Sequence, residues 1–591
     1  MNAKRTWYPL SGATGRSLLR TSGKPGSTKA PVDPRNGPKI ALAGKVVTMD
    51  RRYTVRDDAV VYIADGVIVA IRPRTKPAPK GFEAVAVHET RGTIFPGLIE
   101  LHNHLSYNAL PLWSPVPKRY DNRGQWPNHA DYRKLVSGPM TVIGKYRDAQ
   151  GNYPLLPALI RYVECKCLLG GVTTSQGVML FSNAGVKRFY QGLVRNVEQT
   201  DDPDLPEAQG RIPDLEAKDA AKFLARLNKE DSCFLLHLSE GVSGPGTTDS
   251  TARKHFLALE VGPGKWALND KFTGIHAAGL LAEDFGVLRR SGSSIVWSPM
   301  SNLLLYGDTA RVEAAKQAGV LIGLGSDWSV TGSKNLLGEM KVAWLYNLHN
   351  LGSLFKPREI VAMATRNAAR ILKWDQALGT LKAGARADLL VIDGQAKDPY
   401  MALLRAAETD IRLVMINGVA RYGWPGLMGT LVPADQTVNV GGKSRRLYLK
   451  QETSDPDVAQ VPLKTAVAKL RAALKGIAAF AAEMERPQRS SARRSAALDA
   501  QAPPQWALAL DEIQVAGVQF APRLPFSGPT DTTGPERAPR APSAASPPLS
   551  TLLHPVHLDP LTVADDPGFL TKIEQQPNVP DPIRKGLRGL Y

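Results

Sequence analysis

Short apolar runs that each end in a polar, reactive residue recur along the middle of the chain. One run lies between Gly92 and Tyr107 and ends in His102-Asn103-His104, and later runs end at His237, His276 and Asp327. Segments with helical periodicity separate these runs, so the alternation predicts a parallel α/β fold. Because reactive residues at successive strand ends are typical of a (β/α)8 TIM-like barrel, we expect that architecture.

A second pattern flanks this region. Residues 40–49, 58–63 and 67–71 have strand character, which returns at 381–392 and 411–418. We expect these segments, which lie before and after the barrel in the sequence, to form one small composite β-sandwich domain.

The domain organisation follows from these patterns and from shifts in composition. Residues 462–481 carry an apolar stripe of helical period, and eleven prolines between 503 and 555 indicate a linker. The expected units are a flexible basic arm at 1–38, the composite β-sandwich domain at 39–90 and 376–435, the barrel at 91–375, and a C-terminal extension at 436–591. That extension comprises a helical segment, the Pro-rich linker and a segment that docks back onto the protein.

Composition changes this picture little. Of the 591 residues, 43% are hydrophobic and 22% are charged, which is ordinary for a folded globular protein. No apolar run reaches the roughly 18 to 20 residues that span a bilayer, and the first twenty residues lack the apolar core of a secretory signal. With only three cysteines there is no disulfide framework. We therefore expect a cytoplasmic protein without a membrane partner.

The formal net charge of +19 raises the question of nucleic-acid binding. Part of the excess lies in residues 1–40, which hold eight Lys and Arg against one Asp, and the rest is spread along the chain. Neither aromatic platforms beside the charge nor a basic recognition helix is evident. A solvated basic surface with a basic arm is favoured, and no specific nucleic-acid partner is expected.

The reactive residues suggest a metal site. In an extended chain residues two apart face the same side, so His102 and His104 can converge on one ion. That pair alone is equally compatible with a hydrogen-bonded core. With His237, His276 and Asp327 at other strand ends, a divalent ion with an open position for water becomes the favoured interpretation, and Glu240 is placed to shuttle a proton.

Several stretches of the sequence together resemble the amidohydrolase superfamily. The branch in question holds cytosine, guanine and S-adenosylhomocysteine-type deaminases, triazine chlorohydrolases and imidazolonepropionase. The resemblance covers residues 39 to about 422, and its motifs occur at 95–104, 171–174, 237–240, 298–303, 325–327 and 379–389.

This resemblance implies roles for the site residues. His102, His104, His237 and Asp327 would ligate one divalent metal ion, zinc as the first expectation and iron as the alternative. Glu240 would be the proton shuttle, His276 would polarise the substrate or orient the water, and Asp327 would also take part in proton transfer. Binuclear relatives use a carboxylated lysine at the fourth strand. The lysines here, at 187, 218, 222 and 229, lie in polar or helical settings, so one ion is expected.

Two departures from the family pattern leave the substrate open. Deaminases of this branch commonly have a Cys in the stretch written here as His276-Ala-Ala-Gly279, and Cys-Pro in place of Ser298-Pro299. The C-terminal extension also exceeds the family pattern.

The expected function is metal-dependent hydrolysis of a C–N bond other than a peptide bond in a small molecule, by deamination of an N-heterocycle or opening of a cyclic amide. The alternatives are hydrolytic dehalogenation, hydrolysis of an acyclic amide, or a catalytically silent barrel that serves as a binding protein. Trp113, Trp126 and Trp328 either line an aromatic pocket or pack in the core. The sequence is compatible with a homo-oligomer.

Overall fold

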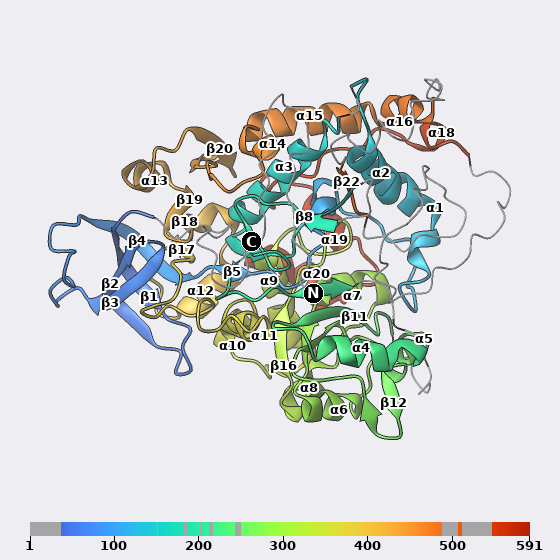
Figure 1. Cartoon of the computed structure of the whole chain (residues 1–591), viewed down its shortest axis with the longest axis horizontal. Helices are drawn as coiled ribbons and strands as arrows, with labels where there is room; N and C mark the ends of the chain where they lie inside the picture. Colours follow the sequence, from blue (N-terminus) through green and yellow to red (C-terminus); the bar gives the residue numbers. More distant parts are fainter. Residues whose placement is uncertain are drawn as a thin grey trace, which may run out of the picture.

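The computed structural model describes most of the chain and shows a mixed α/β protein (Figure 1). The described residues are 37–486, with gaps at 151, 183–186, 201, 212–214, 216 and 243–249, together with 506–510 and 547–591. All but residues 37 and 38 of the expected basic arm, and most of the Pro-rich linker, therefore lie outside the described residues. Within the described residues, no helix is both long and apolar enough to cross a membrane.

Eight parallel strands form the inner framework. They occur as a three-stranded sheet, β5-β6-β9, and a five-stranded sheet, β10-β11-β14-β15-β16. Their bounds are Leu98–Ile99 for β5, Val172–Ser175 for β6, Arg195–Asn196 for β9, Gln209–Arg211 for β10, Phe234–Leu238 for β11, Phe272–His276 for β14, Ser294–Trp297 for β15 and Leu321–Leu324 for β16.

Backbone contacts link the two parallel sheets at both edges. Ala208 N donates a hydrogen bond of 2.8 Å to Val197 O, between the end of β9 and the start of β10. On the other side, Asn103 forms a parallel bridge with Asp327, beyond β5 and β16. The strands thus follow chain order from β5 to β16, and the last is linked back to the first.

Helices follow most of these strands, as the alternating pattern predicts. Three of them, α6, α7 and α8, end at Gly292, Gly307 and Gly319, each with a positive φ that suits glycine at a helix end. The helices of this layer are α3 (Leu156–Leu169), α4 (Ala220–Leu227), α5 (Thr251–Leu257), α6 (Asp284–Ser291), α7 (Pro299–Tyr306), α8 (Val312–Ala318), α9 (Leu336–Asn350), α10 (Pro357–Met363) and α11 (Arg366–Ile371).

The flanking β segments join in one nine-stranded sheet, in the order β20-β21-β19-β18-β17-β4-β1-β2-β3. Antiparallel pairing of β17 with β4 unites the parts before and after the parallel strands, as Figure 1 shows on the left. The bounds are Ile40–Val47 for β1, Val55–Ala64 for β2, Val67–Pro73 for β3, Val87–Pro96 for β4, Leu389–Asp393 for β17, Ile411–Ile416 for β18, Val419–Gly423 for β19, Gln436–Val440 for β20 and Lys443–Leu447 for β21. The sheet therefore extends past residue 435, where we expected the composite domain to end. Its division into two packed layers stays a prediction.

The first apolar run differs from the expectation of a single strand between Gly92 and Tyr107. Its first part ends β4 in the nine-stranded sheet, and its second part is β5 in a parallel sheet. Gly97 separates the two parts. A Cβ atom at this position would collide with the Thr173 side chain, so the position favours glycine. His102 and His104 lie beyond β5 and not on a regular strand.

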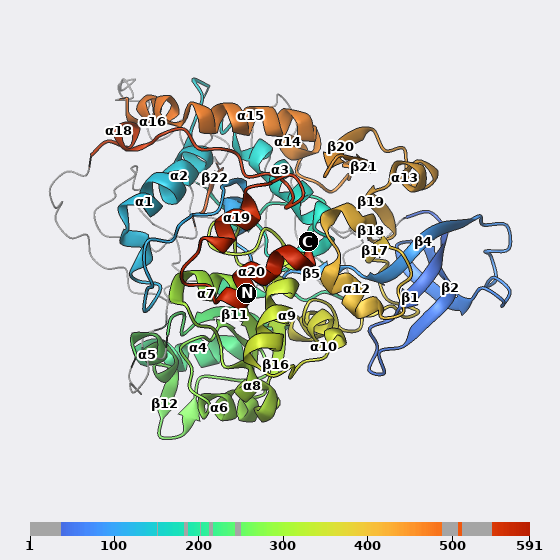
Figure 2. The same cartoon turned by 180° about the vertical axis from the view of Figure 1, so that it is seen from behind.

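The C-terminal region packs against the framework. The expected helical stripe is interrupted at Gly476, which separates α15 (Leu463–Lys475) from α16 (Ile477–Glu485). The segment 547–591 contains α18 (Leu549–Leu552), α19 (Phe569–Glu574), α20 (Asp581–Gly586) and the 3-10 turn η6 (Leu587–Leu590). Apolar side chains of this segment share a buried cluster with α7 and α9, and Figure 2 shows α20 beside α9.

The remaining elements are short. The strands are β7 (Met179–Ser182), β8 (Lys187–Phe189), β12 (Glu260–Gly262), β13 (Lys265–Trp266) and β22 (Trp506–Leu508). The helices are α1 (Ala130–Tyr132), α2 (Gly138–Lys145), α12 (Pro399–Arg405), α13 (Pro425–Leu431) and α14 (Pro456–Ala459). The helical turns are η1 (Leu105–Ala109), η2 (Trp126–Asn128), η3 (Arg133–Ser137), η4 (Ala217–Asp219) and η5 (Glu408–Asp410).

Candidate metal centre and active site

Four histidines from three places in the framework meet in one buried cluster. His102 and His104 follow β5, His237 lies on β11 and His276 ends β14. The ring centroid of His102 lies 5.0 Å from that of His104, 4.7 Å from that of His237 and 5.0 Å from that of His276. The structure therefore brings together all four histidines that the strand-end pattern singled out.

Asp327 completes the cluster from beyond β16. Its Oδ1 atom lies 3.2 Å from His102 Nε2 and 3.3 Å from His104 Nε2. Two backbone hydrogen bonds of 2.9 Å hold it there, one from Asp327 N to His102 O and one from His104 N to Asp327 O. Its other oxygen, Oδ2, accepts a hydrogen bond of 2.6 Å from Ser301.

The donor atoms of this cluster fit a metal ion. Those of His102, His104 and Asp327 lie within 4.8 Å of one another, and so do those of His102, His237 and His276. His102 Nε2 and Asp327 Oδ1 are buried, yet neither makes a well-formed hydrogen bond with the described residues. Buried polar atoms normally have partners, and imidazole nitrogen and carboxylate oxygen are good ligands for zinc.

Gln176 orients His102. Its Oε1 atom lies 3.1 Å from His102 Nδ1 and also accepts a hydrogen bond of 3.1 Å from Asn103 N. Because an amide oxygen can only accept, His102 Nδ1 carries the proton and Nε2 presents its lone pair to the cluster. This is the tautomer that a metal ligand needs.

His276 has the opposite tautomer. Trp297 Nε1 donates to Thr309 Oγ1, and the Thr309 hydroxyl group in turn donates to Asn302 Oδ1. These bonds fix the Asn302 amide group with its oxygen toward Thr309 and its nitrogen toward His276. Asn302 Nδ2 then donates to His276 Nδ1 over 3.0 Å. The proton of a neutral His276 is thus on Nε2, which suits a hydrogen-bond donor and not a ligand.

Glu240 lies beside His276, three residues after His237. Its Oε1 accepts a hydrogen bond of 2.7 Å from the Tyr306 hydroxyl group, and its Oε2 lies 3.6 Å from His276 Nε2. The buried guanidinium group of Arg123 is 4.0 Å from Oε2. The two carboxylate oxygens therefore have different surroundings.

The environment sets the charges of these groups. Burial, together with the nearby imidazoles and Arg123, lowers the pKa of His237 well below its usual value, and burial likewise lowers that of His276. Burial raises the pKa of Glu240. Burial alone would raise the pKa of Asp327, but the nearby imidazoles of His102, His104 and His276 hold it below the usual range. Neutral imidazoles and an ionised Asp327 are the forms that bind metal.

The backbone is strained at the same place. His276, Ala277, Asp327 and Ser239 all have positive φ angles, of 68°, 54°, 64° and 49°. Such conformations are unfavourable for residues other than glycine, and they cluster at functional sites.

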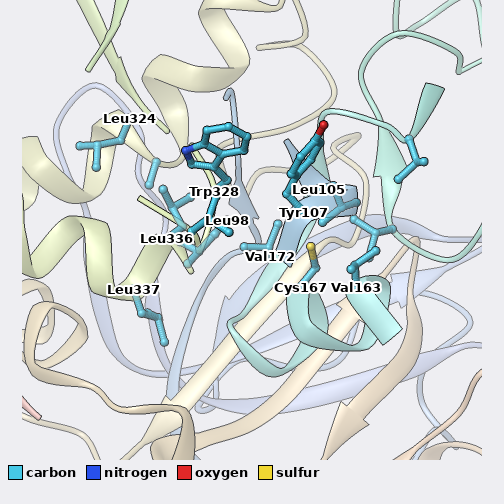
Figure 3. Packing of buried hydrophobic residues seen from close by; sticks show 14 of the residues in the cluster. Leu98, Leu105, Tyr107, Val163, Cys167, Val172, Leu324, Trp328, Leu336 and Leu337 are labelled. Carbon is cyan, nitrogen blue, oxygen red and sulfur yellow. The ribbon is translucent and has the colours of Figure 1, made fainter. Parts of the chain in front are cut away.

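An aromatic group lies next to the histidines. The Trp328 ring centroid is 4.9 Å from that of His104 and 5.0 Å from that of Tyr107, and Figure 3 shows Trp328 and Tyr107 in the buried cluster. The ring centroid of Trp126 lies 5.7 Å from that of Trp328. Trp113 instead packs on Tyr132, with ring centroids 5.5 Å apart. The expected trio thus divides into two rings near the site and one in the surrounding core.

Comparison with known proteins gives the family. The model of the amidohydrolase family matches residues 252–421. The chain is 33% identical over 420 residues to 5-methylthioadenosine/S-adenosylhomocysteine deaminase 1 of Syntrophus aciditrophicus (strain SB), a match that covers 64% of this chain and 90% of the relative. The chain belongs to the amidohydrolase family.

Other relatives match a similar share of this chain. A 5-methylthioadenosine/S-adenosylhomocysteine deaminase of Nitratidesulfovibrio vulgaris (strain DSM 19637 / Miyazaki F) is 26% identical over 435 residues, which cover 66% of this chain and 96% of the relative. The crystal structure of a triazine hydrolase variant superposes with a TM-score of 0.50 at 20% identity, and covers 65% of this chain and 94% of its own. At that identity the likeness concerns the fold alone.

Sequence reasoning on this amidohydrolase missed the residues around the reactive groups. Ser301 and Asn302 lie within a motif that was recognised, but their contacts with Asp327 and His276 were not foreseen. Gln176 directly follows β6, so it is a polar residue at a strand end, as the histidines are. No local pattern of the sequence singled out Arg123 or Tyr306 as a residue of the site.

Proposed function

We propose that this protein is a metal-dependent hydrolase that acts on a C–N bond of a small molecule other than a peptide, by deamination of an N-heterocycle or opening of a cyclic amide. The observation that carries the proposal is the buried cluster of four histidines and Asp327, with Glu240 3.6 Å from His276. It is supported by relatives that are named deaminases and that match this chain over nearly their whole length.

The proposed architecture is a (β/α)8 barrel, formed by the strands from β5 to β16, with the nine-stranded sheet as a composite domain beside it. The chain-order arrangement and the bridge from Asn103 to Asp327 support the closed barrel. The proposed units are 91–375 for the barrel and the segments on either side for the composite domain.

The proposed ligands are His102, His104, His237 and Asp327, around one divalent ion. Zinc is the first choice, with iron as the alternative, because imidazole suits both. When bound, such an ion lowers the pKa of a coordinated water so that hydroxide is available near neutral pH. His276 stays outside this set because its Nε2 carries a proton.

The chain's own groups then have distinct tasks. Glu240 Oε2 takes the proton of the attacking water and delivers it to the departing nitrogen. His276 Nε2–H donates to the substrate atom on which negative charge develops. Asp327 stays ionised between the histidines and can accept a proton in turn.

We further propose a cytoplasmic location. It is supported by the three cysteines, Cys165, Cys167 and Cys233, which are buried and free of disulfides.

Replacement of Glu240 tests the proposal. Purified protein is assayed for ammonia release from 5′-methylthioadenosine, S-adenosylhomocysteine, adenosine and guanine. Opening of a cyclic amide releases no ammonia and is followed by titration of the new carboxyl group, and chloride release from a chlorotriazine is the alternative outcome. Glu240→Gln should lower turnover by about 10²- to 10⁴-fold because the proton acceptor is gone, with metal content near one ion per chain by elemental analysis. His102→Ala should lose the ion.

The control is Glu452→Gln, an exposed residue that should leave both measurements unchanged. Protein that contains no metal, or a Glu240→Gln variant with full activity on the same substrate, would show the proposed function to be wrong.

A further inference from the structure

The Tyr306 hydroxyl group lies between Glu240 and Trp126. It donates to Glu240 Oε1 over 2.7 Å and accepts from Trp126 Nε1 over 3.0 Å. Tyr306 is fully buried, and Glu240 and Trp126 are less than one-tenth exposed. The three side chains thus form one hydrogen-bonded row that is shielded from solvent.

The direction of this row follows from the groups themselves. An indole N–H can only donate, so Trp126 fixes the Tyr306 oxygen as its acceptor. The hydroxyl proton is then free for Glu240, and a hydrogen bond to a carboxylate is among the stronger ones in proteins. Trp126 therefore turns Tyr306 toward Glu240.

Three elements converge on this row. Tyr306 ends α7, Glu240 follows β11, and Trp126 lies in η2, within residues 113–128, here named the cover segment. The cover segment is fixed to both neighbours: Tyr120 N donates to Leu305 O over 2.9 Å, and Val242 N donates to Asp121 O over 2.9 Å. The arrangement is thus part of the framework and not a chance contact of one mobile side chain.

We propose that Tyr306 is a positioning residue for Glu240, oriented by Trp126, an inference that rests on the proposed role of Glu240 in proton transfer. By holding Oε1, Tyr306 leaves Oε2 to face His276 at 3.6 Å, on the side of the histidine cluster. One carboxylate oxygen is anchored and the other is left for proton transfer, so the carboxylate does not rotate between the two tasks of accepting and delivering a proton.

The variant Tyr306→Phe tests this role because it keeps the ring and removes only the hydroxyl group. With the best substrate of the heterocycle panel, kcat should fall by at least about tenfold, while KM and metal content stay near the wild-type values. A crystal structure of the variant should show the Glu240 carboxylate turned from its wild-type orientation, which is a readout independent of any substrate.

Tyr120→Phe is the matched control. Tyr120 is also a buried tyrosine of the cover segment, but its hydroxyl group has no hydrogen-bond partner among the described residues. The control should retain the wild-type kcat. Trp126→Phe should lower kcat in the wild-type background and add little in the Tyr306→Phe background, because both changes break the same row.

The outcomes separate this inference from the proposed function. A Tyr306→Phe variant with wild-type kcat, or with Glu240 in its wild-type orientation, overturns the positioning role while an inactive Glu240→Gln variant still supports the function. An active Glu240→Gln variant overturns the function itself. If no substrate is found, the orientation of Glu240 in the crystal decides.

Discussion

Neighbouring hydrogen bonds decide what each histidine of the cluster can do. At His102, Gln176 accepts the Nδ1 proton, so Nε2 presents a lone pair to the cluster. At His276, Asn302 donates to Nδ1, so Nε2 carries the proton and is a hydrogen-bond donor. Both rings lie in the same buried cluster. Distance alone would make His276 a ligand, and its hydrogen bond argues for a donor to the substrate.

Buried carboxyl groups near the site have an effect on stability as well. Glu339 is fully buried on α9 and accepts a hydrogen bond of 3.0 Å from Met300 N, at the start of α7. Burial raises the pKa of Glu339 to about 8. Between pH 4.5 and pH 8 the folded protein thus holds a proton that the unfolded chain has lost. The free energy of unfolding therefore decreases as the pH rises through this range.

We predict that Glu339→Gln removes this pH dependence. The unfolding free energy of the variant relative to wild type should rise with pH, by up to about 1.4 kcal/mol for each pH unit between 5 and 8. Urea denaturation at pH 5 and pH 8 measures the difference, with Glu452→Gln as the exposed control. A variant whose difference from wild type is the same at both values would contradict the prediction.

At the scale of elements, the C-terminal segment 547–591 anchors the loops around the site. Gln576 is fully buried, accepts from Val116 N over 3.0 Å and donates to Ser114 Oγ over 2.7 Å. Asn578 Nδ2 donates to both Lys118 O and Leu304 O, at 3.2 and 2.9 Å. The segment therefore holds the cover segment against α7, on which Tyr306 lies.

The same segment supplies a buried ion cluster. Asp559 pairs at 2.5 Å with both Lys166 of α3 and Lys334, which precedes α9. Lys166 in turn donates to Asn108 O, in η1, over 2.8 Å. All three charged groups are almost fully buried, so each depends on its partners to offset the cost of leaving water.

Asp559→Asn should lower the free energy of unfolding by about 3–5 kcal/mol, because two lysines lose a buried counter-charge. Urea denaturation measures the loss. Asp581→Asn is the control on the same segment: its pairs with Arg584 and Lys585 are exposed, and exposed pairs contribute little. Equal changes in the two variants would contradict the structural importance of Asp559.

For the whole molecule, the pairing of β4 with β17 is what joins the first hundred residues to the region after residue 388. Gly92 lies in this pairing, opposite Asp393. A Cβ atom there would collide with the Ile392 carbonyl oxygen and lie 2.9 Å from Val391 Cγ1. The nine-stranded sheet therefore tolerates only glycine at this position.

Gly92→Ala should destabilise the protein by about 1–3 kcal/mol, as expected when an atom is forced into a packed interior. The midpoint of thermal unfolding measures this. Gly429→Ala, where a Cβ atom meets nothing within 4 Å, is the control and should leave the midpoint unchanged or slightly raised. A Gly92→Ala protein as stable as the control would contradict this account of the sheet.

Local signals explain what could be predicted from the sequence. Apolar runs and the residue types at their ends revealed His102, His237, His276 and Asp327, and the structure brings them together. Contacts between distant residues carry no such signal. Tyr306 reaches Glu240 across 66 positions, and no local pattern of the sequence indicates that contact. The β segments before and after the parallel strands were expected to join in one domain, but the sequence did not predict that β4 is the strand that pairs with β17.

The anchoring of the cover segment also orders events during synthesis. Val116 is separated from Gln576 by 460 positions, which at 5–20 residues per second means roughly 20 to 90 s of translation. All the proposed ligands have been made well before that contact can form. The histidine cluster is thus complete in sequence before the cover segment gains these anchors, and the position of that segment against α7 is fixed only after residue 576 has been made.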